Sequence, residues 1–157
     1  MSAAHPTDSL PTLAFVRAGW HAELVDRAQQ GFLEVATAER AVVETFEVPG
    51  AFELPLHAQT LAETGRFDAI VAAGLVVDGG IYRHEFVANA ILNGFVAVST
   101  ATEVPVLSAV LTPQRFDEND PGDLAFFAEH LVGKGIEIAR SALEVVPVVR
   151  ALRQEVR

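Results

Sequence analysis

The sequence predicts a three-layer α/β fold, with helices on both sides of a central four-stranded, mainly parallel sheet. Short apolar runs rich in Val and Ile alternate along the chain with longer segments of helical periodicity. Glycine or proline stands at most of the changes between the two patterns. The 157 residues are enough for one independent core and leave no room for a second domain. Strands that are joined through helices pair in parallel, so the helices must cover both faces of the sheet.

The first half of the chain contains two strand–helix units. A buried strand is expected over residues 12–16, followed by a turn at 17–20. The next segment places its apolar residues on one helical face, at Leu24, Val25, Ala28 and Phe32. A second strand is expected over 41–48, and Pro49-Gly50 ends it before a helix over 51–64.

The second half repeats this alternation. A strand buried on both faces is predicted over residues 68–77, and a helix from about 82 to 100. The next strand, 106–111, is followed by an exposed polar loop at 114–122.

The last helix is predicted from residue 123 to about 152. Its apolar positions recur at helical spacing, at Phe126, Phe127, Leu131, Ile136, Ala139, Leu143 and Val146. Gly133 and Gly135 weaken its middle, and Pro147 is expected to end or kink it.

Composition excludes several classes of function. A net charge of −10 opposes a nucleic-acid surface, which needs clustered lysine and arginine. Cysteine is absent, and the five histidines lack close ligand spacing, so no metal site is expected. The polar residues 1–10 are expected to form a flexible tail without signal-peptide features, and no apolar run is long enough to cross a membrane. These observations predict a cytoplasmic protein.

The apolar content points to association between subunits. Half of the residues are hydrophobic, and the mean hydropathy is +0.30. A small monomer cannot bury that much apolar surface, so a homo-oligomer is expected. Because the overall charge repels anions, an anionic substrate needs a local cationic pocket.

The segment 68–86 is the strongest candidate for a functional site. A buried strand stops at Gly79 and Gly80, and a helix is expected to begin close behind them. Such a turn presents bare backbone N–H groups at the carboxyl edge of a sheet, where anions and other ligands bind. His84 falls within the first turns of that helix and is able to exchange protons near neutral pH.

Three separated motifs and one aromatic residue carry a family resemblance: VPGAFELP at 48–55, GLVVDGGIYRHEF at 74–86, KGIEIA at 134–139, and Trp20 after the first strand. Together they resemble the lumazine synthase family. WH at 20–21, VPVLS at 104–108 and LTP at 111–113 look most like its second type. The resemblance covers nearly the whole chain and implies a single flavodoxin-like domain over residues 11–157. It also implies a homo-oligomer of pentamers, typically a decamer.

The resemblance further implies a reaction. 5-Amino-6-(ribitylamino)uracil condenses with 3,4-dihydroxy-2-butanone 4-phosphate to give 6,7-dimethyl-8-ribityllumazine, inorganic phosphate and water. This is the penultimate step of riboflavin synthesis, and it requires neither a metal nor an organic cofactor. The protein has to position two small molecules and move protons.

Most of the site residues follow from positions aligned with the family, whereas Arg83, Arg115 and His130 are candidates for a charge that the aligned position lacks. His84 matches the proton-transferring histidine, and Trp20 the aromatic that stacks on the pyrimidine. The remaining pyrimidine and ribityl contacts would come from Ala51, Phe52, Glu53, Leu75, Val76, Val77, Ser108 and Lys134. Backbone donors for the phosphate would come from Gly79, Gly80 and Ile81, with charge from Arg83, Arg115 or His130. Several of these residues can equally have a purely structural role. Leu75, Val76 and Val77 can belong to the core, and Lys134 can form a surface ion pair with Glu137.

The chain also departs from the common family pattern. Asp78 replaces an arginine, an extra residue precedes the histidine, and Phe126 stands where the family carries a phosphate-binding arginine. These departures leave open a second function, a weakly active or inactive oligomer that binds lumazine or flavin. A flavodoxin or receiver domain ranks last, because no serine- or threonine-rich phosphate loop and no acidic pair follows the first strand.

Overall fold

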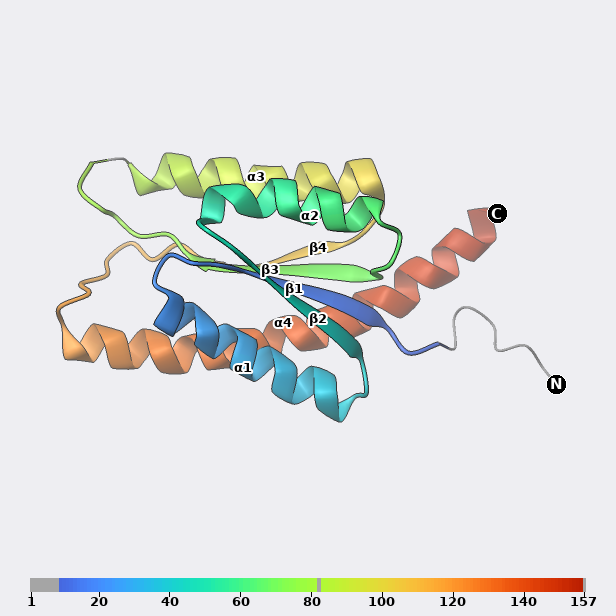
Figure 1. The fold of residues 1–157 in the computed structure, drawn as a ribbon, viewed down its shortest axis with the longest axis horizontal. Helices are drawn as coiled ribbons and strands as arrows, with labels where there is room; N and C mark the ends of the chain where they lie inside the picture. Colours follow the sequence, from blue (N-terminus) through green and yellow to red (C-terminus); the bar gives the residue numbers. More distant parts are fainter. Residues whose placement is uncertain (1–8, 82, 157) are drawn as a thin grey trace.

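The computed structural model describes residues 9–81 and 83–156. It contains a parallel sheet between two helical layers (Figure 1). The strands are β1 (Thr12–Ala18), β2 (Val42–Val48), β3 (Ala69–Leu75) and β4 (Val106–Leu111). The helices are α1 (Ala22–Ala38), the short 3-10 turn η1 (Ala51–Glu53), α2 (Leu54–Glu63), α3 (His84–Thr102) and α4 (Pro121–Val156).

All four described strands run parallel, in the order β2-β1-β3-β4. β3 pairs with both β1 and β4, and all seven of its residues are buried. A strand covered on both faces has no polar side to offer, which explains its continuous apolar run. The predicted fold class is therefore confirmed.

The core has two halves, one on each face of the sheet. Figure 1 shows α2 and α3 above the sheet and α1 and α4 below it. Because side chains alternate along a strand, Val16 and Ile70 join the α2–α3 half, whereas their neighbours Phe15 and Val71 join the other half.

The two helices of the lower layer touch through glycine. A Cβ atom added to Gly31 would lie 2.1 Å from the Val132 carbonyl oxygen, and one added to Gly135 would lie 2.0 Å from the Ala28 carbonyl oxygen. No side chain fits between these backbones. The expected weakening of α4 at Gly135 is thus offset by close packing against α1.

The end of α4 differs from the prediction. Pro147 lies inside the helix, which continues to Val156, so the alternative that the helix ends there is wrong. The helix axis bends along its length (Figure 1), as an internal proline allows. Arg150 donates hydrogen bonds to the Ser9 carbonyl oxygen at 2.7 Å and to Asp68 Oδ2 at 2.8 Å. These contacts hold the last turns of α4 against the amino edge of the sheet.

Three other element boundaries differ from the predicted ones by a few residues. The β3–β4 ladder ends at Leu75 and Leu111, so the strand predicted to residue 77 stops at 75. The next helix, α3, begins at His84. The helix expected at 51–64 opens with the 3-10 turn η1. Tyr82 and residues 1–8 of the expected tail lie outside the described residues.

Among the residues that the structure describes, no helix is both long and apolar enough to cross a membrane.

Candidate active site

The carboxyl edge of the sheet carries hollows that share residues with one another. The largest, here called the Trp20 cavity, has a volume of about 540 Å³ and is lined by Trp20, His21, Phe52, Leu75, Val77, Gly79, Ile81, His84 and Val87. The turn pocket, about 510 Å³, is lined by Asp78, Gly80, Ile81, Arg83, His84, Glu85 and Phe86. The loop pocket, about 490 Å³, is lined by Asp78, Gln114, Arg115, Phe116, Asp117, Asp120 and Asp123. His84 and Ile81 join the first two, and Asp78 joins the last two.

Trp20 is held in place by the turn that follows β2. The indole lies so close to Gly50 that a Cβ atom there would meet Trp20 Cε2 at 2.5 Å. Phe52 approaches edge-on, with the ring centroids 6.2 Å apart. Trp20 nevertheless keeps 39% of its surface exposed. One wall of the cavity is therefore an immobilised aromatic ring with room beside it for a flat ligand.

His84 is the first residue of α3, and its side chain is only 12% exposed. Its Nδ1 atom lies 3.7 Å from Glu85 Oε2, beyond hydrogen-bond distance. Within residues 9–81 and 83–156 the imidazole has no hydrogen-bond partner, so both ring nitrogens are left for a ligand. A largely buried imidazole facing a cavity suits proton transfer.

The glycine turn lies between the cavity and the turn pocket. Gly79 and Gly80 have no atom within 4 Å of an added Cβ, and Gly80 has φ +82°, a conformation that favours glycine. The Gly80 N–H donates to Asp78 Oδ1 at 2.9 Å. The turn thus has the bare backbone that was predicted, with one donor already engaged by a carboxylate.

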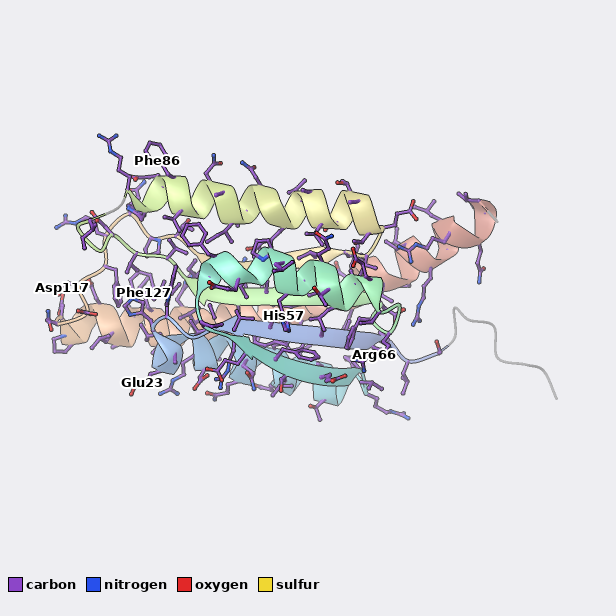
Figure 2. The ribbon with its side chains drawn as sticks, turned by 45° about the horizontal axis from the view of Figure 1, so that its top comes forward. Glu23, His57, Arg66, Phe86, Asp117 and Phe127 are labelled. Carbon is purple, nitrogen blue, oxygen red and sulfur yellow. The ribbon has the colours of Figure 1, made fainter. Side chains whose placement is uncertain are left out.

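The arginines expected near a phosphate lie in different hollows. Arg83 lines the turn pocket, and its guanidinium lies 5.9 Å from the centroid of the Phe86 ring. Arg115 lines the loop pocket. Figure 2 shows Phe86 pointing away from the start of α3, at the same end of the molecule as Asp117.

Several predicted residues do not line these hollows. Ala51 and Val76 are buried, and Glu53 Oε2 accepts a hydrogen bond from the Gly50 N–H at 3.0 Å. Other side chains lie along α4 and β4. Lys134 Nζ lies 3.5 Å from Glu137 Oε1, His130 stacks on Phe126, and Ser108 Oγ accepts from the Val110 N–H at 3.2 Å.

Sequence reasoning missed two residues of the Trp20 cavity, His21 and Val87. His21 has φ +52° just before α1, and its ring meets Phe116 edge-on at a centroid distance of 5.4 Å. Its position directly after Trp20 was the available signal. Val87 stands one turn after His84, so helical spacing alone would have placed it on the same face.

The arrangement can hold a flat ring and exchange protons beside it. The side chains around the Trp20 cavity are apolar except for Trp20 Nε1 and the two imidazoles of His21 and His84. Apolar walls with a few convergent polar groups are typical of small-molecule sites. Within the described ranges, no group of His, Asp or Glu is arranged to hold a metal ion.

Comparisons with known proteins find one family. A family model described as 6,7-dimethyl-8-ribityllumazine synthase matches residues 11–150. The chain is 51% identical over 143 residues to a 6,7-dimethyl-8-ribityllumazine synthase of Rhodococcus erythropolis, covering 89% of this chain and 92% of the relative. It is 49% identical over 154 residues to 6,7-dimethyl-8-ribityllumazine synthase 2 of Bradyrhizobium diazoefficiens, covering 97% and 93%. It is also 46% identical over 156 residues to the synthase 2 of Pseudomonas syringae pv. tomato, covering 98% and 89%.

Proposed function

The chain belongs to the 6,7-dimethyl-8-ribityllumazine synthase family, and we propose that the Trp20 cavity is the place where it performs the reaction. The enzyme is a transferase of riboflavin biosynthesis. It joins 5-amino-6-(D-ribitylamino)uracil to 3,4-dihydroxy-2-butanone 4-phosphate and releases 6,7-dimethyl-8-ribityllumazine, inorganic phosphate and water.

One observation carries the assignment of the cavity. Trp20 comes from the turn after β1, Gly79 and His84 come from the segment between β3 and α3, and all three line the same 540 Å³ space. A stacking ring, a bare backbone turn and a proton carrier are what a condensation between a uracil and a sugar-phosphate fragment needs. No observation on the described residues favours the alternative of an oligomer that only binds lumazine or flavin.

In this proposal the pyrimidine ring stacks on the exposed face of Trp20. Phe52, Leu75 and Val77 form the apolar walls around it. Ala51, Glu53 and Val76 act indirectly: Glu53 holds the Gly50 turn beneath the indole, while Ala51 and Val76 are packed behind the walls. This arrangement fixes the plane in which the aminouracil presents its two nitrogens.

The phosphate end of the second substrate binds at the glycine turn. The N–H groups of Gly79, Gly80 and Ile81 are its donors, and the start of α3 adds a favourable dipole. Arg83, in the turn pocket, is the nearest candidate for the missing arginine, and Arg115 and His130 are more remote candidates. The butanone chain then lies between the turn and Trp20, next to His84.

His84 takes and returns the protons of the reaction. Imine formation requires a proton to leave the attacking amine, and elimination of phosphate requires loss of a proton from carbon. An imidazole can serve both steps near pH 7. In this proposal His84 acts between the two substrates, and its place in the lining of both the Trp20 cavity and the turn pocket supports this role.

A homo-oligomer of pentamers, most simply a decamer in the cytoplasm, completes the proposal. The outward face of α3 between Glu85 and Glu103 is free of charge: Phe86, Asn89, Ala90, Asn93, Val96, Ala97, Thr100 and Ala101. Such a helix face is suited to contact another protein surface. We propose that Ser108, Lys134 and His130 contact the cavity of an adjacent subunit, because none of them lines the cavity of its own.

An assay with both substrates tests the function. Purified protein should form 6,7-dimethyl-8-ribityllumazine, followed by its absorbance, with phosphate released in equal amount. Binding of the product without turnover would contradict this function and support the alternative, an oligomer that only binds lumazine or flavin.

Light scattering tests the assembly. The proposal requires a mass of ten chains, and Ala97→Glu on the uncharged α3 face should dissociate the particle. A monomeric wild-type protein would overturn the shared-site arrangement.

A further inference from the structure

The turn that is proposed to bind phosphate already holds an anion of its own. Asp78 Oδ1 accepts the Gly80 N–H at 2.9 Å, the geometry that a phosphate oxygen would use. Gly80 has φ +82°, a left-handed conformation that favours glycine at this point of the turn. The carboxylate of Asp78 therefore stands where part of the substrate has to bind.

The charges around the turn add to this competition. The turn pocket is lined by two carboxylates, Asp78 and Glu85, against one arginine, Arg83. On its other side, Asp78 faces the loop pocket, which brings three more aspartates against Arg115. Within the described residues, Asp78 makes no ion pair with either arginine. Its negative charge is thus not neutralised by a partner.

We propose that Asp78 sets the affinity of the enzyme for its phosphorylated substrate by occupying the Gly80 donor and repelling the incoming dianion. This inference rests on the proposed function, because it takes the glycine turn as the phosphate site. When the phosphate binds, the Asp78 carboxylate gives up the Gly80 N–H and turns away from it. The same charge speeds the release of inorganic phosphate after the reaction.

Two substitutions separate the charge from the hydrogen bond. Asp78→Asn removes the charge while its side-chain oxygen still accepts the Gly80 N–H. Asp78→Ala removes both and frees the donor. Asp78 is exposed and lies outside the strands and helices, so both variants should fold as the wild type does.

The expected result is a selective gain in phosphate affinity. Neutralising one charge next to a dianion should lower KM for the butanone phosphate, and the inhibition constant of inorganic phosphate, by about three- to tenfold at low salt. Asp78→Ala should lower both at least as far. KM for the aminouracil should stay unchanged, and added salt should shrink the difference from wild type.

Glu118→Gln is the matched control, because it removes one exposed negative charge from the loop at the same end of the molecule without touching a hollow. It should leave both constants within about twofold of wild type, since Glu118 lines neither the turn pocket nor the loop pocket and its exposed charge is screened by solvent and salt. An equal effect of Glu118→Gln and Asp78→Asn would overturn the proposal, as would unchanged constants in both Asp78 variants.

The wild-type protein distinguishes this failure from a failure of the proposed function. If inorganic phosphate inhibits wild type in competition with the butanone phosphate but Asp78→Asn behaves identically, the proposed role of Asp78 is wrong and the phosphate site is retained. If phosphate does not compete in wild type at all, the phosphate site itself is wrong, and the role of Asp78 falls with it.

Discussion

The seam between α1 and α4 and the carboxyl edge of the sheet both depend on glycine, for opposite reasons. At the seam, Gly31 and Gly135 let two backbones meet, and an added Cβ atom would lie 2.1 or 2.0 Å from a carbonyl oxygen. At the edge, Gly79 and Gly80 have nothing within 4 Å of an added Cβ. At the first pair, the facing helix occupies the space that a side chain would need, whereas at the second pair that space is open.

The difference separates stability from function in this molecule. Glycine at the seam removes a side chain so that protein can contact protein, and a larger residue there has to push helices apart. Glycine at the edge leaves backbone donors bare beside a cavity, and a larger residue there meets only what enters the cavity. Substitutions in the two regions should therefore appear in different measurements.

The largest effect is expected for His84→Ala at the edge. Loss of a general acid–base group should reduce kcat by about 100-fold. Binding of a substrate analogue and the thermal unfolding midpoint should change little, because the imidazole makes no hydrogen bond to the described part of the chain. Steady-state kinetics beside a calorimetric melt measures both. An unchanged kcat would remove His84 from the mechanism.

Gly135→Ala should have the largest effect on stability. The new methyl group would overlap the Ala28 carbonyl oxygen, and forcing the helices apart should cost about 2 kcal/mol of unfolding free energy. Denaturant titration measures the loss. Activity of the folded fraction should be retained, so a stable but inactive variant would contradict the separation of the two regions.

Gly79→Ala should show the reverse pattern with a smaller effect. No neighbour obstructs the methyl group, and Gly79 does not have a positive φ, so the unfolding free energy should stay the same or rise slightly. The methyl group enters the cavity beside the proposed phosphate donors. We expect KM for the butanone phosphate to rise by about three- to tenfold, as for loss of one hydrogen bond. Unchanged kinetics would place the phosphate elsewhere.

The smallest effect is expected for Gly133→Ala, which serves as the control for the seam. Gly133 is exposed on α4, two residues from Gly135, and an added Cβ atom meets nothing within 4 Å. Replacing a helical glycine with alanine should raise the unfolding free energy by about 0.5–1 kcal/mol. A loss as large as that of Gly135→Ala would show that the close approach of the two helices is not what makes position 135 sensitive.

Element type could be read from the sequence because local pattern and burial agree. The continuous run in β3 and the 3- and 4-residue spacing of Ala88, Ile91, Phe95 and Val98 in α3 each match the face that they bury. Pro147 shows the limit of this reasoning. Its ring opposes a helix, but the hydrogen bonds of Arg150 to Ser9 and Asp68 stabilise the continuation, and these partners are more than 80 residues away.

The candidate site was predictable where a residue type and its place in a motif together indicate one chemical role. Trp20, Gly79 and His84 each stand out locally, and the structure brings them into one cavity. His21 was not predicted, because its place in the cavity depends on a left-handed backbone and on Phe116 from a distant loop. The hydrogen bond from Gly80 to Asp78 was equally invisible, since it depends on the conformation of the turn.

The sequence by itself therefore determined the order and kind of the elements, the edge of the sheet that holds the candidate site, and the family, because periodicity and motifs are local properties of the chain. The tertiary structure alone decided which glycines let two helices meet and which face a cavity. It also decided which side chains line that cavity, and which donor of the turn Asp78 occupies. These depend on distances between segments that are remote in the chain, and such distances are set only when the layers pack.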